Sequence, residues 1–196
     1  DDALFTSISA SCVTGLTVVE TATYFSPKGQ ALIMMLIQMG GLNIISFASI
    51  FALFAGKSIG LKHQTIIQDS LNVESLNDGS KLFRKVFKFS LIIEIIGALL
   101  IFFSWNAYEF ESLRQKLFFS IFHSISAFNN AGFSLFENGL YLEEIRDFYG
   151  FHWIIGILII LGGIGFAVIT DVLNVKSKLK KGKSFWKTLQ ANSKIA

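Results

Sequence analysis

Two short strings of this sequence each join an apolar run to a glycine, and it is their backbone that could do chemistry. FTSISASCVTG covers residues 5–15, and FHSISAFNNAG covers residues 122–132, 117 positions further along. Glycine accepts positive φ and lets neighbouring backbone approach closely, so consecutive carbonyl oxygens can turn toward one axis. Carbonyl oxygens arranged in this way replace the hydration shell of a cation. The pattern therefore predicts a cation path lined by main chain.

We expect the ion-facing backbone where each apolar run ends. No charged side chain lies in either stretch, which disfavours multivalent cations held by carboxylate rings and favours a monovalent ion. A helix that stops at this point would aim the partial negative charge of its C-terminal end in the same direction. The candidate residues are Val13, Thr14, Gly15, Asn130, Ala131 and Gly132.

Glu94 lies in the middle of the apolar stretch LIIEIIGALL. A carboxyl group inside a membrane is costly, and by default it suggests a functional site. It could couple transport to H⁺ or Na⁺. It could equally be a hydrogen-bonded tie between helices, with Gln38 or Asn43 as its partner.

Other polar residues have simpler interpretations. Glu20 and Glu137 each follow a candidate loop by five residues, where they could raise the local cation concentration or only cap loops. His123 and His152 lack metal-ligand spacing with Cys or carboxylate groups, so we expect no structural metal and interpret both as interfacial or hydrogen-bonded. Asp171 is better placed to pair with nearby lysines than to bind ions. No Ser-His-Asp set, phosphate loop or catalytic carboxylate pair occurs, and we expect neither enzyme activity nor a bound cofactor.

The elements that must position these residues are apolar helices. Of the 196 residues 52% are hydrophobic and only 16% are charged, with 21 Phe and a single Pro. A hydrocarbon core of about 30 Å needs roughly 20 apolar residues in a helix. Three stretches have that length: residues 31–55, 86–105 and 148–173. We predict an all-α polytopic membrane protein.

Two further apolar stretches, residues 3–13 and 117–128, are too short to cross. As helices they would extend about 17 Å, or half of the membrane. One such segment alone would suggest an amphipathic surface helix. Two copies, each followed by a long apolar stretch, favour re-entrant half-helices in repeated span–pore-helix–span units.

Charge placement predicts the orientation. Basic residues outnumber acidic ones between the first and second spans, and seven lysines with no acid follow Asp171; the segment between the second and third spans is acidic. By the positive-inside rule, residues 57–85 and 174–196 are cytoplasmic and residues 105–147 are outside. A nucleic-acid patch is the alternative interpretation of the lysine-rich tail, but topology explains it better in so apolar a chain.

A pair of glycines recurs within two of the spans, in QMGGLNIISF (38–47) and ILGGIGFAVI (160–169). Glycine inside a helix costs roughly 1 kcal/mol relative to alanine, so another interaction must offset it. Close packing on the half-helix is one explanation, because small residues let helices approach in lipid. A kink or hinge is the alternative.

Together these motifs resemble the Trk/Ktr/HKT superfamily of K⁺ transporters, and most closely its bacterial Ktr/NtpJ-type membrane subunits. The strings that carry the resemblance are SCVTGLTVVET, IQMGGLNIISF, FHSISAFNNAGFSLF and GGIGFAVITD. The resemblance implies K⁺ uptake through a pore built from four span–pore-loop–span repeats. It implies that the six candidate residues are filter backbone. Glycine in both loops resembles K⁺-selective members, whereas serine there is linked to Na⁺ permeation.

The resemblance also implies which repeats are present, about one and a half in all. Residues 1–56 would hold the first-repeat pore loop and inner span, 57–85 a cytoplasmic linker, 86–173 the second repeat, and 174–196 a basic lead into a third. Such a chain would be a fragment that forms no closed pore alone. Asn43 departs from the family pattern, which has glycine there, and this affects packing rather than the ion path.

Partners and location follow from the same resemblance. It implies a homodimer in the lipid bilayer of the bacterial inner membrane, multi-pass, with a cytoplasmic nucleotide-binding regulatory subunit of the RCK/KTN type. Residues 57–85 and 174–196 would face that subunit, and no nucleic acid is expected. Two alternatives stay open: a Na⁺-permeable or Na⁺-coupled variant, and a non-conducting membrane scaffold. K⁺, and under the first alternative Na⁺, is the transported ion.

Overall fold

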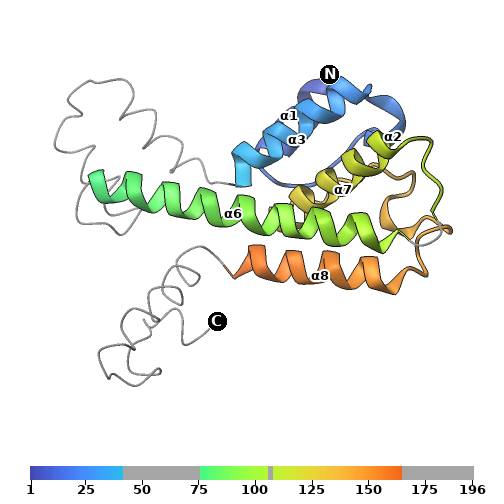
Figure 1. The fold of residues 1–196 in the computed structure, drawn as a ribbon. Coiled ribbons are helices and arrows are strands. Elements are labelled where there is room, and N and C mark those ends of the chain that lie inside the picture. Colours follow the sequence, from blue (N-terminus) through green and yellow to red (C-terminus); the bar gives the residue numbers. More distant parts are fainter. Residues whose placement is uncertain (42–75, 106–107, 165–196) are drawn as a thin grey trace.

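The computed structural model describes residues 1–41, 76–105 and 108–164, and these form helices joined by loops with no strand among them. In chain order the helices are α1 (Asp2–Ser11), α2 (Thr21–Tyr24), α3 (Pro27–Gly41), α6 (Leu76–Ser104), α7 (Leu113–Phe128), the 3₁₀ helix η1 (Gly139–Tyr141) and α8 (Tyr149–Gly163). Helix α1 packs on α3, whereas α6, α7 and α8 pack on one another, and α3 also reaches α7 (Figure 1). The predicted all-α class is confirmed for the described residues.

Helix α6 is long and apolar enough to cross a membrane. Its segment Val86–Ser104 has 19 residues and coincides with the predicted span 86–105, whereas α8 is a shorter apolar helix. The helix itself begins at Leu76, inside the predicted linker 57–85. The first predicted span is described only as far as Gly41, and the third only as far as Ile164. The remainder of both spans, Asn43, Asp171 and residues 174–196 lie outside the described residues.

The two predicted half-helices differ in length. Helix α1 has 10 residues, but α7 has 16 and begins at Leu113 rather than at residue 117. Its start is set by Ser112, whose Oγ accepts a hydrogen bond from the Gln115 N–H at 3.2 Å. This N-cap satisfies a backbone donor that the helix leaves unpaired. Counting apolar residues missed the polar first turn, so α7 is about 24 Å long rather than half a membrane.

Two buried clusters hold the helices together. One joins α1 and α3 to α7 and its following loop: Ala10, Ile33, Ile37, Phe122, Ala131, Phe133 and Leu135. The other lies between α6, α7 and α8 around Trp105, whose Nε1 donates to Ser120 Oγ at 3.0 Å and whose ring centroid is 4.7 Å from that of Phe151. The core therefore fixes both candidate loops relative to one another.

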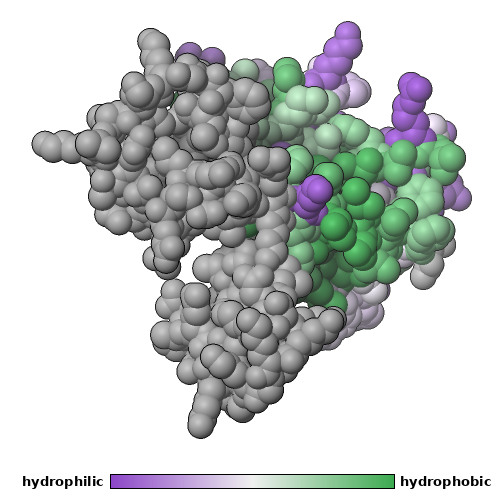
Figure 2. All heavy atoms as spheres, turned by 60° about the vertical axis from the view of Figure 1, so that its left-hand side comes forward, coloured by the Kyte–Doolittle hydropathy of each residue, from purple (hydrophilic) through white to green (hydrophobic). Residues whose placement is uncertain are grey.

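The outer surface of α6 is strongly apolar. Seven of its large side chains are between 43% and 76% exposed: Leu91, Ile92, Ile95, Ile96, Leu99, Leu100 and Phe103. Figure 2 shows apolar residues gathered over much of the described surface that is visible in that view. Water-soluble monomers rarely expose so large an apolar patch, so this surface fits contact with lipid or with further protein.

Candidate functional site

Helix α1 ends in a Schellman motif, which reverses the chain at the first candidate loop. The N–H of Thr14 donates to Ser9 O at 3.0 Å, and that of Val13 donates to Ala10 O at 3.2 Å. These are the two bonds that define the motif. Val13 has a φ of 55° and Gly15 a φ of 73°. Positive φ is rare for a β-branched residue, so the surroundings must hold Val13 in this conformation.

Helix α7 ends in the same motif, 117 positions later. The N–H of Ala131 donates to Ser126 O at 2.8 Å, and that of Asn130 donates to Ala127 O at 3.0 Å. Asn130 has a φ of 56° and Gly132 a φ of 74°. The repeated sequence therefore takes one backbone conformation at both places, and each glycine follows the helix end by the same interval.

The two candidate loops meet at their glycines. A Cβ atom added to Gly132 would lie 3.5 Å from the Gly15 Cα, and one added to Gly15 would lie 2.6 Å from the Ala131 carbonyl oxygen. That second distance leaves no room for a side chain at position 15. A further link joins the loops, because Glu20 Oε1 accepts a hydrogen bond from the Asn138 N–H at 3.3 Å. The structure thus brings the two sets of predicted residues together.

The glycine pairs of α3 and α8 contact the C-terminal ends of α1 and α7. A Cβ atom added to Gly40 would clash with the Ser11 carbonyl oxygen, and one added to Gly162 would clash with that of Phe128. Ser11 and Phe128 are the last residues of α1 and α7. Both glycines therefore serve the close packing that the sequence suggested, at matching places in the two units.

The side chain of Asn130 connects the second loop to the same part of α8. With its carboxamide turned to suit its neighbours, Nδ2 donates to Ile159 O at 3.2 Å and Oδ1 accepts from the Gly163 N–H at 3.3 Å. Those two backbone atoms are one helical turn apart. A displacement of α8 at this turn would therefore also displace the loop backbone at Asn130.

Glu94 is buried in a polar cluster that joins three helices. Its Oε1 accepts hydrogen bonds from Ser90 Oγ and from Asn129 Nδ2, both at 3.1 Å. Gln38 of α3 approaches the same carboxyl group. The Gln38 amide atoms and Glu94 Oε2 are buried without a hydrogen-bond partner among the described residues. Asn129 caps α7 directly before the second candidate loop, so Glu94 contacts that loop through one residue.

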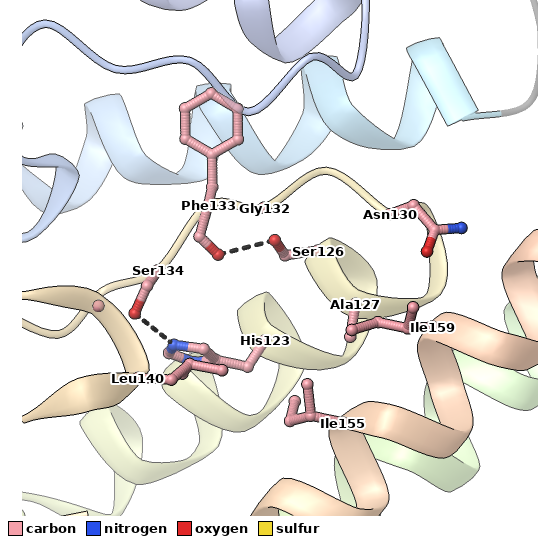
Figure 3. A pocket seen from close by; sticks show the side chains of 11 residues that line it. His123, Ser126, Ala127, Asn130, Gly132, Phe133, Ser134, Leu140, Ile155 and Ile159 are labelled. Atoms are coloured by element: carbon pink, nitrogen blue, oxygen red, sulfur yellow. Dashed lines mark hydrogen bonds between the residues drawn. The ribbon is translucent and has the colours of Figure 1, made fainter. Parts of the chain in front are cut away.

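Side chains of α7 also hold the segment that follows Gly132. Ser126 Oγ donates to Phe133 O at 2.7 Å, and His123 Nε2 lies 3.1 Å from Ser134 Oγ. Both contacts border a cavity of about 370 Å³ between this segment and α8, with Ile155 on its far side (Figure 3). His123 is hydrogen-bonded, as expected from the sequence, but its partners after Gly132 and the role of Ser126 were not predicted, although both residues belong to the repeated string.

The remaining predicted residues lie apart from the loops. Glu137 is exposed, and His152 is half-buried on α8 with Nε2 3.1 Å from Ile145 O. Within the described residues, no three His, Cys, Asp or Glu side chains are grouped closely enough to hold a metal ion.

Comparison with known proteins gives a family and several relatives. The TrkH family, described as "Cation transport protein", matches residues 1–193. The chain is 44% identical over 172 residues to Ktr system potassium uptake protein B of Bacillus subtilis, and 37% identical over 179 residues to potassium/sodium uptake protein NtpJ of Enterococcus hirae. Each match covers 88% of this chain but only 38% of the relative, so the chain spans well under half of their length.

Proposed function

The chain belongs to the TrkH family of cation transport proteins, and we propose that the whole protein takes up K⁺ across a membrane. The relatives from Bacillus subtilis and Enterococcus hirae are named as a potassium uptake protein and a potassium/sodium uptake protein. A family of transporters offers no enzyme chemistry, so the proposed activity is ion translocation alone, with K⁺ as the transported ion.

In this proposal the ion is selected by backbone carbonyl oxygens of the two candidate loops, Val13–Gly15 and Asn130–Gly132. One observation carries the idea: both loops leave a helix through the same reversal and place a glycine of positive φ where the loops meet. Such oxygens substitute for the water around a cation without a charged side chain. The described loops would form two walls of a path that further parts of the protein complete.

The proposed architecture is a set of span–pore-helix–span repeats. Helix α6 would be the first span of the second repeat, α7 its pore helix, and α8 the start of its inner span; α1 and α3 would be the matching elements of the first repeat. The shared helix ends and glycine contacts support this pairing. Residues 57–85 and 174–196 would lie in the cytoplasm and residues 105–147 outside, because positive charge is retained inside.

We further propose a homodimer in the bacterial inner membrane with a separate cytoplasmic regulatory subunit of the nucleotide-binding RCK/KTN type. Relatives named as proteins of a "Ktr system" support a multi-component assembly. The basic segments 57–85 and 174–196 would face that subunit.

A Na⁺-permeable variant is the second candidate, because one relative is named a potassium/sodium uptake protein. Against it stands the glycine in both loops, which fits the K⁺-selective pattern. A non-conducting scaffold is the third candidate. The Na⁺-permeable variant, the scaffold and the main proposal predict different effects of substituting a loop glycine on ion flux and on discrimination between K⁺ and Na⁺.

The test is Gly132→Ser in the full-length protein, expressed in bacterial cells that lack their own K⁺ uptake. We expect wild-type protein to restore growth at low K⁺, and the variant to discriminate K⁺ from Na⁺ roughly tenfold less well, a change of about 1.4 kcal/mol. Gly139→Ser is the matched control, since Gly139 also has positive φ, 64°, but no atom lies within 4 Å of an added Cβ. Unchanged K⁺ flux and discrimination in Gly132→Ser would favour a scaffold.

A further inference from the structure

The two candidate loops end their helices alike, yet the segments that follow their glycines are held differently. Phe133 and Leu135, after Gly132, are each 3% exposed, whereas Leu16 and Val18, at the matching places after Gly15, are 64% and 56% exposed. One wall of the site is therefore embedded in the fold, and the other lies at the surface of the described part.

The embedded segment is hydrogen-bonded to α7 through His123. The ring nitrogen Nδ1 lies 2.8 Å from Phe119 O, and because a carbonyl oxygen can only accept, Nδ1 carries the proton. Nε2 of the neutral ring is then an acceptor. It takes the Ser134 hydroxyl at 3.1 Å and the Leu135 N–H at 3.4 Å. The ring also stacks on Phe136, with centroids 4.8 Å apart.

The first loop lacks this connection. The residue at the matching place is Thr6, which is fully buried and whose Oγ1 has no hydrogen-bond partner. Ser9, which matches Ser126, contacts Thr14 Oγ1 within its own loop at 2.9 Å. In the described part of the chain, no side chain of α1 is hydrogen-bonded to residues 16–18.

Packing alone does not hold the second segment, because the cavity of about 370 Å³ lies beside it. Gly132, Phe133 and Ser134 border this cavity together with His123 and Ser126 (Figure 3). Without the hydrogen bonds from α7, the segment would have free volume to move into. The hydrogen bonds from α7 therefore act together with the buried side chains of Phe133 and Leu135 to fix the carbonyl oxygens near Gly132.

We propose that His123 is a positioning residue for ion selectivity: as a neutral acceptor it holds the segment after Gly132 and keeps that wall of the filter rigid. This inference rests on the proposed function, because it assigns a selectivity role to the same site. Without the His123 acceptor, the segment after Gly132 could move into the cavity and close around a smaller cation. Loss of the acceptor therefore lowers discrimination against Na⁺ more than it lowers K⁺ uptake.

The experiment compares His123→Leu, which removes the acceptor, with His123→Gln, whose Oε1 is the same number of bonds from the backbone as Nε2. Both are made in the full-length protein and assayed for K⁺ and Na⁺ uptake. We expect His123→Leu to lower the K⁺/Na⁺ uptake ratio between about threefold and tenfold, the range for losing the shorter of its two Nε2 hydrogen bonds, and His123→Gln to restore most of it. Ser134→Ala, which removes the hydroxyl donor and keeps the ring with its Leu135 contact, should lower the ratio in the same direction even if His123→Leu folds poorly.

Thr6→Val is the matched control, because Thr6 occupies on α1 the position that His123 occupies on α7. We expect a wild-type uptake ratio, since the Thr6 hydroxyl has no hydrogen-bond partner. A wild-type ratio in both His123→Leu and Ser134→Ala, or equal loss in His123→Leu and His123→Gln, would overturn the inference. Wild-type protein that takes up no K⁺ would instead contradict the proposed function. In that case, unchanged amide exchange at Leu135 in His123→Leu would overturn the positioning role, and faster exchange would support it.

Discussion

Glu94 is the residue whose function the structure clarifies most. A carboxyl group in the apolar interior needs partners, and Ser90 and Asn129 supply two donors to a single oxygen. The backbone oxygen of the same residue accepts from Ser124 Oγ at 2.7 Å. Two contacts from α7, those of Asn129 and Ser124, therefore meet at one residue of α6, which supports the hydrogen-bonded tie over a coupling group.

The tie predicts that Glu94→Gln retains K⁺ uptake, because the carboxamide keeps an oxygen that can accept from both donors. Glu94→Leu should lower the free energy of unfolding by about 1–3 kcal/mol, since it leaves the Asn129 and Ser90 donors without that acceptor. Uptake assays and melting in detergent would measure both effects. A Glu94→Gln protein that folds normally but no longer transports would point to coupling through the ionisable group.

For single residues, the sequence predicted which of them come together, but not the hydrogen bonds that hold them in place. The repeat of Ser-Ile-Ser-Ala and glycine located both loops, because backbone conformation near a helix end depends on local sequence. The hydrogen bond from Asn129 to Glu94 depends on which helices pack together, and those of His123 depend on how the segment after Gly132 folds back on α7. No local pattern encodes either arrangement. Asn43, proposed as a partner of Glu94, lies outside the described residues.

Among the elements, the contact of α1 and of α7 with a glycine pair determines how close the helices come. Gly40 and Gly162 occupy equivalent places against the last carbonyl groups of α1 and α7. Because the half-helix ends there, its terminal carbonyl has no partner within the helix. A larger residue on α3 or α8 would push that end, and the loop after it, out of place.

Gly162→Ala should therefore destabilise the protein by about 1–3 kcal/mol through overpacking. Gly156 lies on the same helix with no atom within 4 Å of an added Cβ, so Gly156→Ala should leave stability unchanged or raise it slightly. Thermal unfolding of both variants in detergent provides the comparison. Equal melting temperatures for the two variants would contradict the packing role.

Apolar length predicted the existence of the elements better than their ends. The span over 86–105 was recognised because about 20 apolar residues have few alternatives to a membrane helix. Helix α7 starts at Leu113 in polar sequence, and the described part of α6 includes the polar residues from Leu76 onward. The short helices α2 and η1 were not predicted, because a single turn leaves no periodic pattern to read.

For the whole molecule, the proposed topology places the acidic segment between α6 and α8 outside and the basic segments inside. Tyr141, on η1 in the acidic segment, is 77% exposed. Lys181 belongs to the basic segment that would face the cytoplasm. The two positions therefore report on opposite sides of the membrane.

Cysteine labelling of whole cells tests this arrangement. After Cys12→Ser removes the only cysteine of this chain, and any elsewhere in the full-length protein are also replaced, Tyr141→Cys should react with a membrane-impermeant maleimide added outside. Lys181→Cys should react only once the cells are permeabilised. The reverse pattern of labelling would contradict the topology and, with it, the re-entrant path of α7.

The most direct measurement is a structure of the full-length protein in Tl⁺, a K⁺ substitute that is visible by anomalous scattering. We predict a Tl⁺ peak surrounded by main-chain oxygens of residues 13–15 and 130–132, with water-filled access from outside. Tl⁺ bound only elsewhere in the protein, with these two loops closed off from water, would contradict the account.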